Sequence, residues 1–427
     1  MSRDPQSFSP SALAVAVSAA LVVTTAVLVP WGAPGGLVSK AADINDYFSP
    51  AQIARSESFH DAIKWPAWLL LAVQLLVAAL LVFTRLGRRL TALAQRGTSR
   101  WWLQVVTLVT LVSVATSLVT VPLGAWAHVV AVDYGLSSQS WPGWLLDRLK
   151  SVGLSVTFMS LGLLVLVWLA RRFTHTWFFP AAAAAAAAGI VMSFAYPVVV
   201  EPVFNTFTPL ADGPLRSSLM ELAERDGVKV SDVLVSDASR RTTALNAYVS
   251  GFGSSKRIVV YDTLVDSASQ RETELIVAHE LGHAKADDVV VGTAVGALGA
   301  ALGVLVLFLV LQPDRLRRPG GATSVGDPAI VPVVLALSVF ASILSAPAIN
   351  AVSRQLEARA DLHALNLTSD PRTFIDVQRR LAITNLTHLQ PNQVLAFWFS
   401  SHPGSLERLG MAEAWRDEHA DKSPPHG

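Results

Sequence analysis

The sequence contains no cysteine, and only 15% of its 427 residues are charged. The lack of cysteine excludes disulfide bonds, thiolate metal ligands and a cysteine nucleophile. Soluble domains have about 25% charged residues, so this shortage, together with 52% hydrophobic residues, predicts that much of the chain lies in a lipid bilayer. The formal net charge of +1 is too small to attract nucleic acid, and no nucleic-acid partner is expected.

Long apolar runs occur seven times, and each approaches the roughly 20 residues that a helix needs to cross a bilayer. They lie at about residues 11–30, 66–84, 101–123, 153–170, 178–200, 289–312 and 329–349. The first run has no small-x-small cleavage site before a polar segment, so we interpret it as a retained span. The sequence therefore predicts a mainly α, multi-pass protein of the cell membrane.

Small residues gather in the fifth and sixth runs. Residues 181–188 are all alanine, and glycine recurs at positions 292, 296, 299 and 303. Because small side chains let membrane helices approach closely, we expect both stretches to lie at helix–helix contacts.

The polar segment before the sixth run contains the pattern H-E-x-x-H, formed by His279, Glu280 and His283. Residues four apart lie on the same face of a helix, so the two imidazoles can converge on one metal ion beside the Glu280 carboxylate. Two histidines and a carboxylate, with a fourth position left to water, make up a common catalytic zinc site. The motif predicts one zinc ion per chain.

The third ligand is expected on a second helix. Positions 286 and 289 hold alanine and valine, which excludes the metzincin continuation. Just after the last apolar run, Glu357 and Asp361 are again four residues apart. We predict that Glu357 completes the metal site and that Asp361 accepts a hydrogen bond from the outer nitrogen of a ligand histidine. The alternative is a solvated helix face on which nearby arginines pair with both acids.

These groups predict a zinc metalloendopeptidase. Zinc activates water and polarises the scissile carbonyl, and Glu280 can accept the water proton and pass it to the leaving amine. A further donor is needed for the oxyanion, and His402, with Arg408 six residues later, is the best candidate. A helix-cap role for His402 is the alternative. His363 is expected to face away from Glu357 and is rejected as a ligand.

Two polar stretches are expected to form the catalytic part. Residues 201–288 contain a helical pattern at 215–224, strand-like runs at 233–235 and 258–261, and a third candidate strand at 246–252. We divide the chain into spans one to five (1–200), the first catalytic part (201–288), spans six and seven (289–349), the second catalytic part (350–418) and a tail (419–427).

Several segments, taken in order, resemble the CaaX prenyl protease 1 family of seven-span membrane zinc metallopeptidases. Residues 202–210 resemble the family's segment after span five, and Asn246, Ala247 and Tyr248 its substrate-side strand. The H-E-x-x-H motif with Glu357 and Asp361 resembles its zinc site. The S-H-P sequence at 401–403, followed by Arg408, resembles its C-terminal motif. The similarity covers most of the chain.

The resemblance implies a barrel of spans around a water-filled chamber, capped by a small α+β gluzincin-type domain. It also implies a peptide or protein substrate with a prenylated C-terminus, from which three residues are removed. Asn246 would pair with the substrate backbone, and His402 and Arg408 would stabilise the substrate or the transition state. The composition, rich in alanine, valine and arginine, is typical of a bacterium of high genomic G+C, so the natural substrate stays open.

Two other functions share some of these features. A membrane quality-control zinc protease of the heat-shock type has the same metal motif but only about four spans. A non-catalytic transporter or receptor would be favoured by a site that lacks Glu280 or Glu357, and both are present. The oligomeric state is not predicted.

Basic residues are divided unevenly between the two ends of the spans. The connections on the N-terminal side carry 11 arginines, and those on the side of the catalytic segments carry five lysines and arginines. The positive-inside rule would place the active site outside the cytoplasm, whereas the family resemblance implies the cytosolic side. Both orientations stay open.

Overall fold

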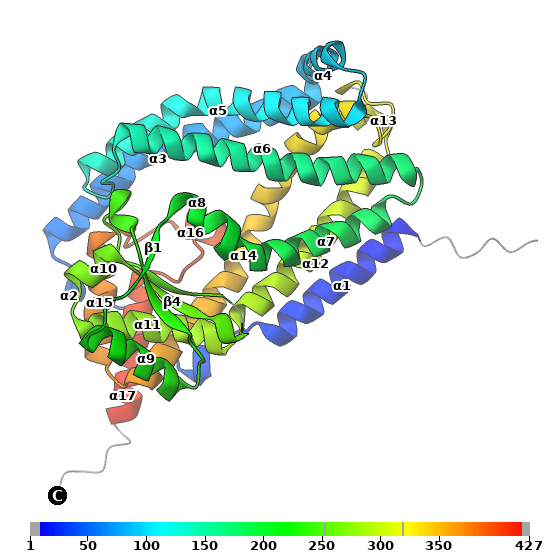
Figure 1. The fold of residues 1–427 in the computed structure, drawn as a ribbon. Coiled ribbons are helices and arrows are strands. Elements are labelled where there is room, and N and C mark those ends of the chain that lie inside the picture. Colours follow the sequence, from blue (N-terminus) through cyan, green and yellow to red (C-terminus); the bar gives the residue numbers. More distant parts are fainter. Residues whose placement is uncertain (1–8, 252, 318–319, 421–427) are drawn as a thin grey trace, which may run out of the picture.

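The computed structural model describes residues 9–251, 253–317 and 320–420. Figure 1 shows long helices that carry a small mixed domain across one end. Among the described residues, seven helices are long and apolar enough to cross a membrane, as predicted. They are α1 (Pro10–Leu28), α3 (Pro50–Phe83), α5 (Trp101–Asp133), α6 (Trp141–Arg172), α7 (Phe178–Ala195), α12 (Asp288–Leu311) and α14 (Val331–Thr368). The α7 span continues through η2 (Tyr196–Val200) into α8 (Glu201–Phe204).

Several spans extend well beyond the predicted apolar runs. The α14 helix is the clearest case, because its 38 residues continue without a break from the last span into the segment that carries Glu357. The predicted boundary between spans and catalytic part at residue 350 therefore falls inside one rigid element. One consequence is that Glu357 is positioned by a helix anchored in the membrane.

Close packing of small residues brings α7 against α12. A Cβ added at Gly189 of α7 would lie 3.9 Å from the Cα of Ala297 on α12, so the backbones approach closely there. The prediction for the glycines of α12 was wrong. A Cβ at position 292, 296, 299 or 303 would meet nothing within 4 Å, because these glycines do not face the neighbouring helix.

The mixed domain contains a four-stranded sheet in the order β1-β2-β4-β3. Its strands are β1 (Phe207–Pro209), β2 (Asp232–Ser236), β3 (Ala247–Ser250) and β4 (Arg257–Tyr261). The central pair β2–β4 is parallel, and both outer pairs are antiparallel. Three strands were predicted, whereas β1 is too short to leave a pattern. Residue 252, the predicted end of β3, and residues 421–427 of the predicted tail lie outside the described residues.

Helices surround the sheet and bury its core. They are α9 (Pro214–Asp226), α10 (Asp262–Ser267), α11 (Gln270–Lys285), α15 (Pro371–Thr384), α16 (Gln393–Phe399) and α17 (Ser405–Ala420), with the short η3 (Ala238–Arg240) and η4 (Gly253–Ser255). Buried side chains such as Leu219, Val233, Ile258, Leu281 and Phe374 form one apolar cluster, separate from the cluster among the spans.

The connection between α1 and α3 also packs on this domain. It contains η1 (Pro34–Gly36) and α2 (Ile44–Tyr47). The backbone N–H of Ala42 donates to the Leu406 carbonyl at 2.9 Å. A Cβ at Gly410 of α17 would lie 1.8 Å from the Lys40 carbonyl oxygen, so only glycine fits there. Residues near the N-terminus therefore help to hold the C-terminal helix in place.

The opposite end of the spans is closed by shorter elements. These are α4 (Leu86–Gly97), α13 (Asp314–Arg317) and η6 (Pro328–Ile330).

Candidate active site

The α11 helix positions the H-E-x-x-H residues. It begins at a capping box, in which the Ser269 hydroxyl and the Glu272 carboxylate each accept from the other residue's backbone N–H. Its apolar face, including Val277, Ala278 and Leu281, is buried in the domain core. The opposite face presents His279, Glu280 and His283 to a cavity. A rigid, buried helix therefore fixes both imidazoles.

The three predicted metal ligands converge. The Nε2 atoms of His279 and His283 lie 3.2 Å apart. The Glu357 carboxylate lies 3.3 Å from His279 Nε2 and 3.6 Å from His283 Nε2. One donor atom from each residue can therefore reach a common metal ion.

The outer nitrogen of each imidazole faces a buried carboxylate. His279 Nδ1 lies 2.9 Å from Asp361 Oδ1, and the Asp361 side chain is fully buried. Asp361 in turn accepts from Arg408 Nε at 2.7 Å and Nη2 at 2.5 Å. The structure thus places Asp361 beside the outer nitrogen of His279, and the predicted hydrogen bond between them stays a prediction. It also pairs Arg408 with Asp361, a contact that the sequence analysis did not anticipate.

The partner of His283 was missed. His283 Nδ1 lies 2.7 Å from Asp288 Oδ2, and Arg359 of α14 contacts the other oxygen of Asp288. Asp287, between α11 and α12, adopts the left-handed conformation with φ 52°. The chain turns there, and this turn directs the Asp288 side chain toward His283. The only signal in the sequence was an acidic pair just past the metal motif.

Electrostatics at the site follow from this crowding of charges. Burial lowers the pKa of His279, but Asp361 and Glu357 outweigh it and raise that pKa to about 10. Burial raises the pKa of Glu280. The two histidines and Arg408 lower this pKa, the Glu357 carboxylate raises it further, and the net shift is upward. A carboxyl group with a raised pKa is a better proton acceptor for general-base work.

His402 also contacts the Glu357 carboxylate. Its Nε2 is 3.4 Å from Glu357 Oε1, and its Nδ1 is 2.9 Å from the Ser401 hydroxyl. If the hydroxyl donates to Nδ1, the ring proton resides on Nε2, which faces the cavity. Burial lowers the pKa of His402. The Glu357 carboxylate raises this pKa, Arg408 lowers it, and the net shift is downward. A lowered pKa favours the neutral imidazole, the form that can donate from Nε2 when Nδ1 accepts from Ser401.

The cavity beside these groups has a volume of about 510 Å³. One wall is the β3 segment, including the predicted Asn246, Ala247 and Tyr248. The β3 strand is the last strand of the sheet on that side, so its outer edge is not paired within the sheet. Tyr248 donates from its hydroxyl to Glu201 at 3.2 Å. Glu280, His402 and Arg408 also line the cavity.

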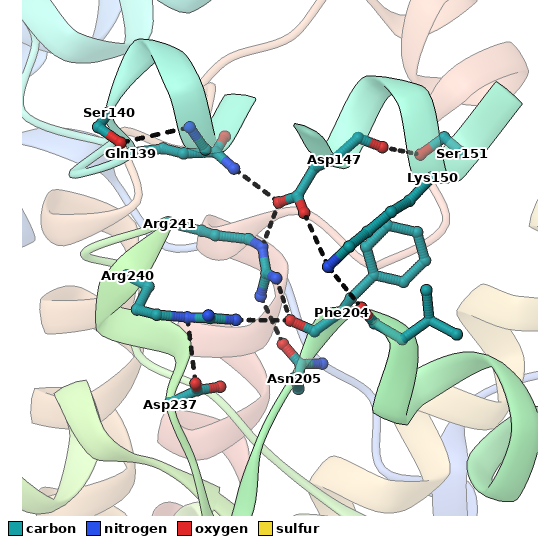
Figure 2. A network of polar contacts seen from close by, with 12 residues as sticks. Gln139, Ser140, Asp147, Lys150, Ser151, Phe204, Asn205, Asp237, Arg240 and Arg241 are labelled. Carbon is teal, nitrogen blue, oxygen red and sulfur yellow. Dashed lines mark hydrogen bonds and ion pairs between the residues drawn. The ribbon is translucent and has the colours of Figure 1, made fainter. Parts of the chain in front are cut away.

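A polar network ties the segment before β3 to the spans (Figure 2). Arg241 Nε donates to Asp147 of α6 at 2.6 Å, and Nη1 donates to Asn205 at 2.7 Å. Arg240 and Arg241 both donate to the Phe204 carbonyl at the end of α8. Lys150 of α6 donates to the Val203 carbonyl at 2.8 Å. These contacts hold the segment before β3, and with it this wall of the cavity, in place relative to the membrane helices.

His363 does not join the metal cluster, as predicted. It points to Asp226 of α9, with Nε2 3.1 Å from the carboxylate, and Lys285 donates to the same carboxylate at 2.7 Å. His363 also lies beside Gly282, where an added Cβ would approach the His363 Cβ to 3.0 Å. The α11 and α14 helices are therefore in close contact between the two ligand histidines.

The donor set fits zinc. Tetrahedral ligands at the usual zinc bond lengths lie about 3.3 Å from one another. The two Nε2 atoms are 3.2 Å apart, Glu357 Oε2 lies 3.3 Å from His279 Nε2, and Glu357 Oε1 lies 3.6 Å from His283 Nε2. Because the Nδ1 atoms face Asp361 and Asp288, the Nε2 lone pairs are directed to the common point.

Comparisons with known proteins agree with this geometry. Residues 39–206 match the family model "CAAX prenyl protease N-terminal, five membrane helices", and residues 209–416 match "Peptidase family M48". An "uncharacterized metalloprotease YhfN" from Bacillus subtilis is 29% identical over 91% of this chain and 92% of its own length. The CAAX prenyl protease 1 of Saccharomyces cerevisiae is 29% identical over 70% of each chain.

The fold also has a solved counterpart. The crystal structure of S. mikatae Ste24p superposes with a TM-score of 0.74 at 22% identity, covering 96% of this chain and all of that one. This likeness confirms the overall arrangement of helices and catalytic domain.

Proposed function

The chain belongs to peptidase family M48 and is a multi-pass membrane metallopeptidase, and from this premise we propose how its residues act. Zinc is the metal, one ion per chain, with His279, His283 and Glu357 as its ligands. Glu280 is the general base, and the enzyme is an endopeptidase. The observation that supports this most directly is the convergence of three donor atoms beside Glu280 on the wall of a 510 Å³ cavity.

Bound zinc supplies a Lewis acid that polarises the scissile carbonyl and activates water. Glu280 takes one proton from the water that attacks the carbonyl carbon, and it delivers this proton to the leaving nitrogen as the C–N bond breaks. His402 donates a hydrogen bond from Nε2 to the oxygen that becomes negative. Arg408 acts as a positioning residue, because its guanidinium is engaged with Asp361, which in turn orients His279.

The substrate backbone binds along β3. An unpaired strand edge beside a catalytic centre can add an extended peptide as a further strand. Asn246 lies exposed just before β3 and lines the cavity, so its amide can pair with the substrate backbone. Ala247 and Tyr248 shape the same wall.

The substrate is a peptide or protein with a prenylated C-terminus. Two observations support this finer proposal. The relatives that share both parts of the chain include proteins named CAAX prenyl protease 1. The cavity is also bordered by residues of membrane helices, namely Val289 of α12 and Ser353 and Leu356 of α14. A lipid attached to the peptide can therefore pack against Val289 and Leu356 beside the cleavage site.

The test is hydrolysis of a prenylated peptide and its unprenylated twin by detergent-purified full-length protein, with bound zinc measured in the same samples. Glu280→Gln is the matched control, because it keeps the size of the side chain and the metal ligands but removes the base. We expect zinc in both proteins and cleavage of only the prenylated peptide by the unmodified enzyme.

The possible outcomes separate the parts of the proposal. Cleavage of both peptides would retain the mechanism and reject the lipid specificity. Full activity of Glu280→Gln would reject Glu280 as the base. Protein that binds no zinc would reject the metal assignment, and zinc without cleavage of either peptide would reject this substrate class.

A further inference from the structure

The end of the helices farthest from the metal-binding residues carries a large excess of positive charge. Figure 1 shows α4, α13 and the connection between α6 and α7 at this end, away from the sheet. The three connections, residues 84–100, 171–177 and 312–330, contain ten arginines, no lysine and two aspartates. One aspartate, Asp327, serves a local turn, since it accepts from the backbone N–H groups of Thr323 and Ala329.

The α4 helix is basic and amphipathic. Its face toward the other helices is buried at Gly87, Thr91 and Ala94, while Leu86 and Leu93 stay exposed. The arginines of α4 and its N-cap are exposed, and none has a carboxylate partner in the described part of the chain: Arg85, Arg88, Arg89 and Arg96. A helix with exposed leucines, a cationic face and no acidic residue is suited to the headgroup layer of a membrane.

A crevice of about 310 Å³ lies at the same end, between the α6–α7 connection, the end of α12 and the loop before η6. Its floor is apolar and includes the buried Trp177 and Phe308. Its rim is polar and exposed at Thr174, His175, Gln312 and Ser324, and Arg317 also lines it. The crevice therefore combines a cation and hydrogen-bonding groups at the mouth with an apolar interior.

The helix and the crevice form one continuous surface. Arg88 of α4 packs beside Gly321, where an added Cβ would lie 3.1 Å from the Arg88 Cγ. The same loop continues to Gly326, whose carbonyl accepts from Arg171 Nη1 at 3.1 Å. Arg171 also lies over the Trp101 ring at 5.4 Å, and tryptophans mark the membrane interface. We call α4, this loop and the crevice the distal basic surface.

We propose that the distal basic surface is a binding site for anionic phospholipid. The crevice takes one phosphate headgroup at its rim and the first part of an acyl chain on its apolar floor, while the α4 arginines bind neighbouring headgroups. Guanidinium groups match the geometry of phosphate oxygens, and basic pockets between membrane helices suit lipid headgroups. A free phosphate ion would leave the apolar floor and the exposed leucines of α4 without a role.

The experiment is native mass spectrometry of the detergent-purified full chain, titrated with phosphatidylglycerol or with phosphatidylcholine of identical acyl chains. We expect phosphatidylglycerol to bind at least tenfold more tightly. The variant Arg88→Gln/Arg89→Gln should weaken its binding about fivefold for each arginine removed. Ser324→Trp, which fills the crevice mouth without changing charge, should remove the most tightly bound lipid.

Matched controls identify the place and the ligand. Arg225→Gln/Arg372→Gln removes two exposed arginines from α9 and α15 of the catalytic domain and should leave phosphatidylglycerol binding unchanged. Equal affinity for the two lipids would overturn the proposal, as would an equal loss in the control pair. Displacement of phosphatidylglycerol by inorganic phosphate at the same concentration would assign the site to a free anion instead.

Discussion

The two histidines that we propose as metal ligands are each held by a carboxylate and an arginine, taken from different parts of the chain. His279 faces Asp361 of α14, which is bound by Arg408 of α17. His283 faces Asp288 at the start of α12, which is bound by Arg359 of α14. The arms differ in burial: the Asp361 and Arg408 side chains are 0% and 15% exposed, against 7% and 30% for Asp288 and Arg359. We call the more buried pair, Asp361 and Arg408, the inner arm, and the pair Asp288 and Arg359 the outer arm. The inner arm should therefore contribute more to the free energy of unfolding than the outer arm.

Removing the ligand that both arms share should have the largest effect. The Glu357 carboxylate contacts both His279 and His283, so Glu357→Ala should abolish zinc binding by purified protein. Metal content measured by mass spectrometry gives the result. Glu221→Ala, which removes an exposed glutamate on α9, is the control. Full retention of zinc by Glu357→Ala would refute the assignment of this ligand.

Breaking the inner arm comes next. Asp361→Ala leaves the buried Arg408 guanidinium without its partner, which should lower the free energy of unfolding by about 3–5 kcal/mol. Loss of the His279 contact should also weaken zinc binding about 10–100-fold. Denaturant unfolding and zinc titration measure the two effects.

A paired variant separates those effects. In Asp361→Leu/Arg408→Met both charges are absent, so stability should return to within about 1 kcal/mol of the original while zinc binding stays weak. Normal zinc affinity in this variant would show that the inner arm does not orient His279.

Changing the distance between α11 and α14 should affect both arms at once, with a smaller effect on stability. Gly282→Ala places a methyl group 3.0 Å from the Cβ of His363, and such overpacking should cost about 1–3 kcal/mol. Gly292→Ala is the matched control, since its methyl group would meet nothing within 4 Å. Equal stability of the two variants would show that the helix contact tolerates the extra volume.

The outer arm should give the smallest change. Asp288→Ala leaves Arg359 partly exposed to water, so we expect a loss of about 1–2 kcal/mol and zinc binding weakened about tenfold. The same unfolding and titration experiments apply. A loss of stability equal to that of Asp361→Ala would contradict the ranking of the arms by burial.

The two arms also show how far the sequence can predict the site. His279 and His283, and likewise Glu357 and Asp361, could be paired because helical spacing places residues four apart on one face. The two spans between the pairs form a hairpin, which predicts that the pairs meet. Asp288 could not, because its contact depends on the left-handed turn at Asp287, which no pattern in the sequence indicates. Arg408 was recognised as part of the site, but its pairing with Asp361 arises from the packing of α17 against α14.

The same contrast holds for the fold. The seven spans follow from long apolar runs, and the helical setting of the H-E-x-x-H motif follows from the spacing of its two histidines. The β1 strand has only three residues, too few for an alternating pattern. The continuity of α14 was hidden because its apolar part ends near residue 349 although the helix does not.

The order of these pieces along the chain has a consequence for biosynthesis. A ribosome makes His279 and His283 first, then both remaining spans, then Glu357 and Asp361, and Arg408 close to the end. His279, His283 and Glu357 can therefore come together only after α12 and the apolar part of α14 have been made. A chain whose synthesis stops before α14 carries the H-E-x-x-H helix without Glu357 and Asp361, so the proposed metal site is incomplete in it.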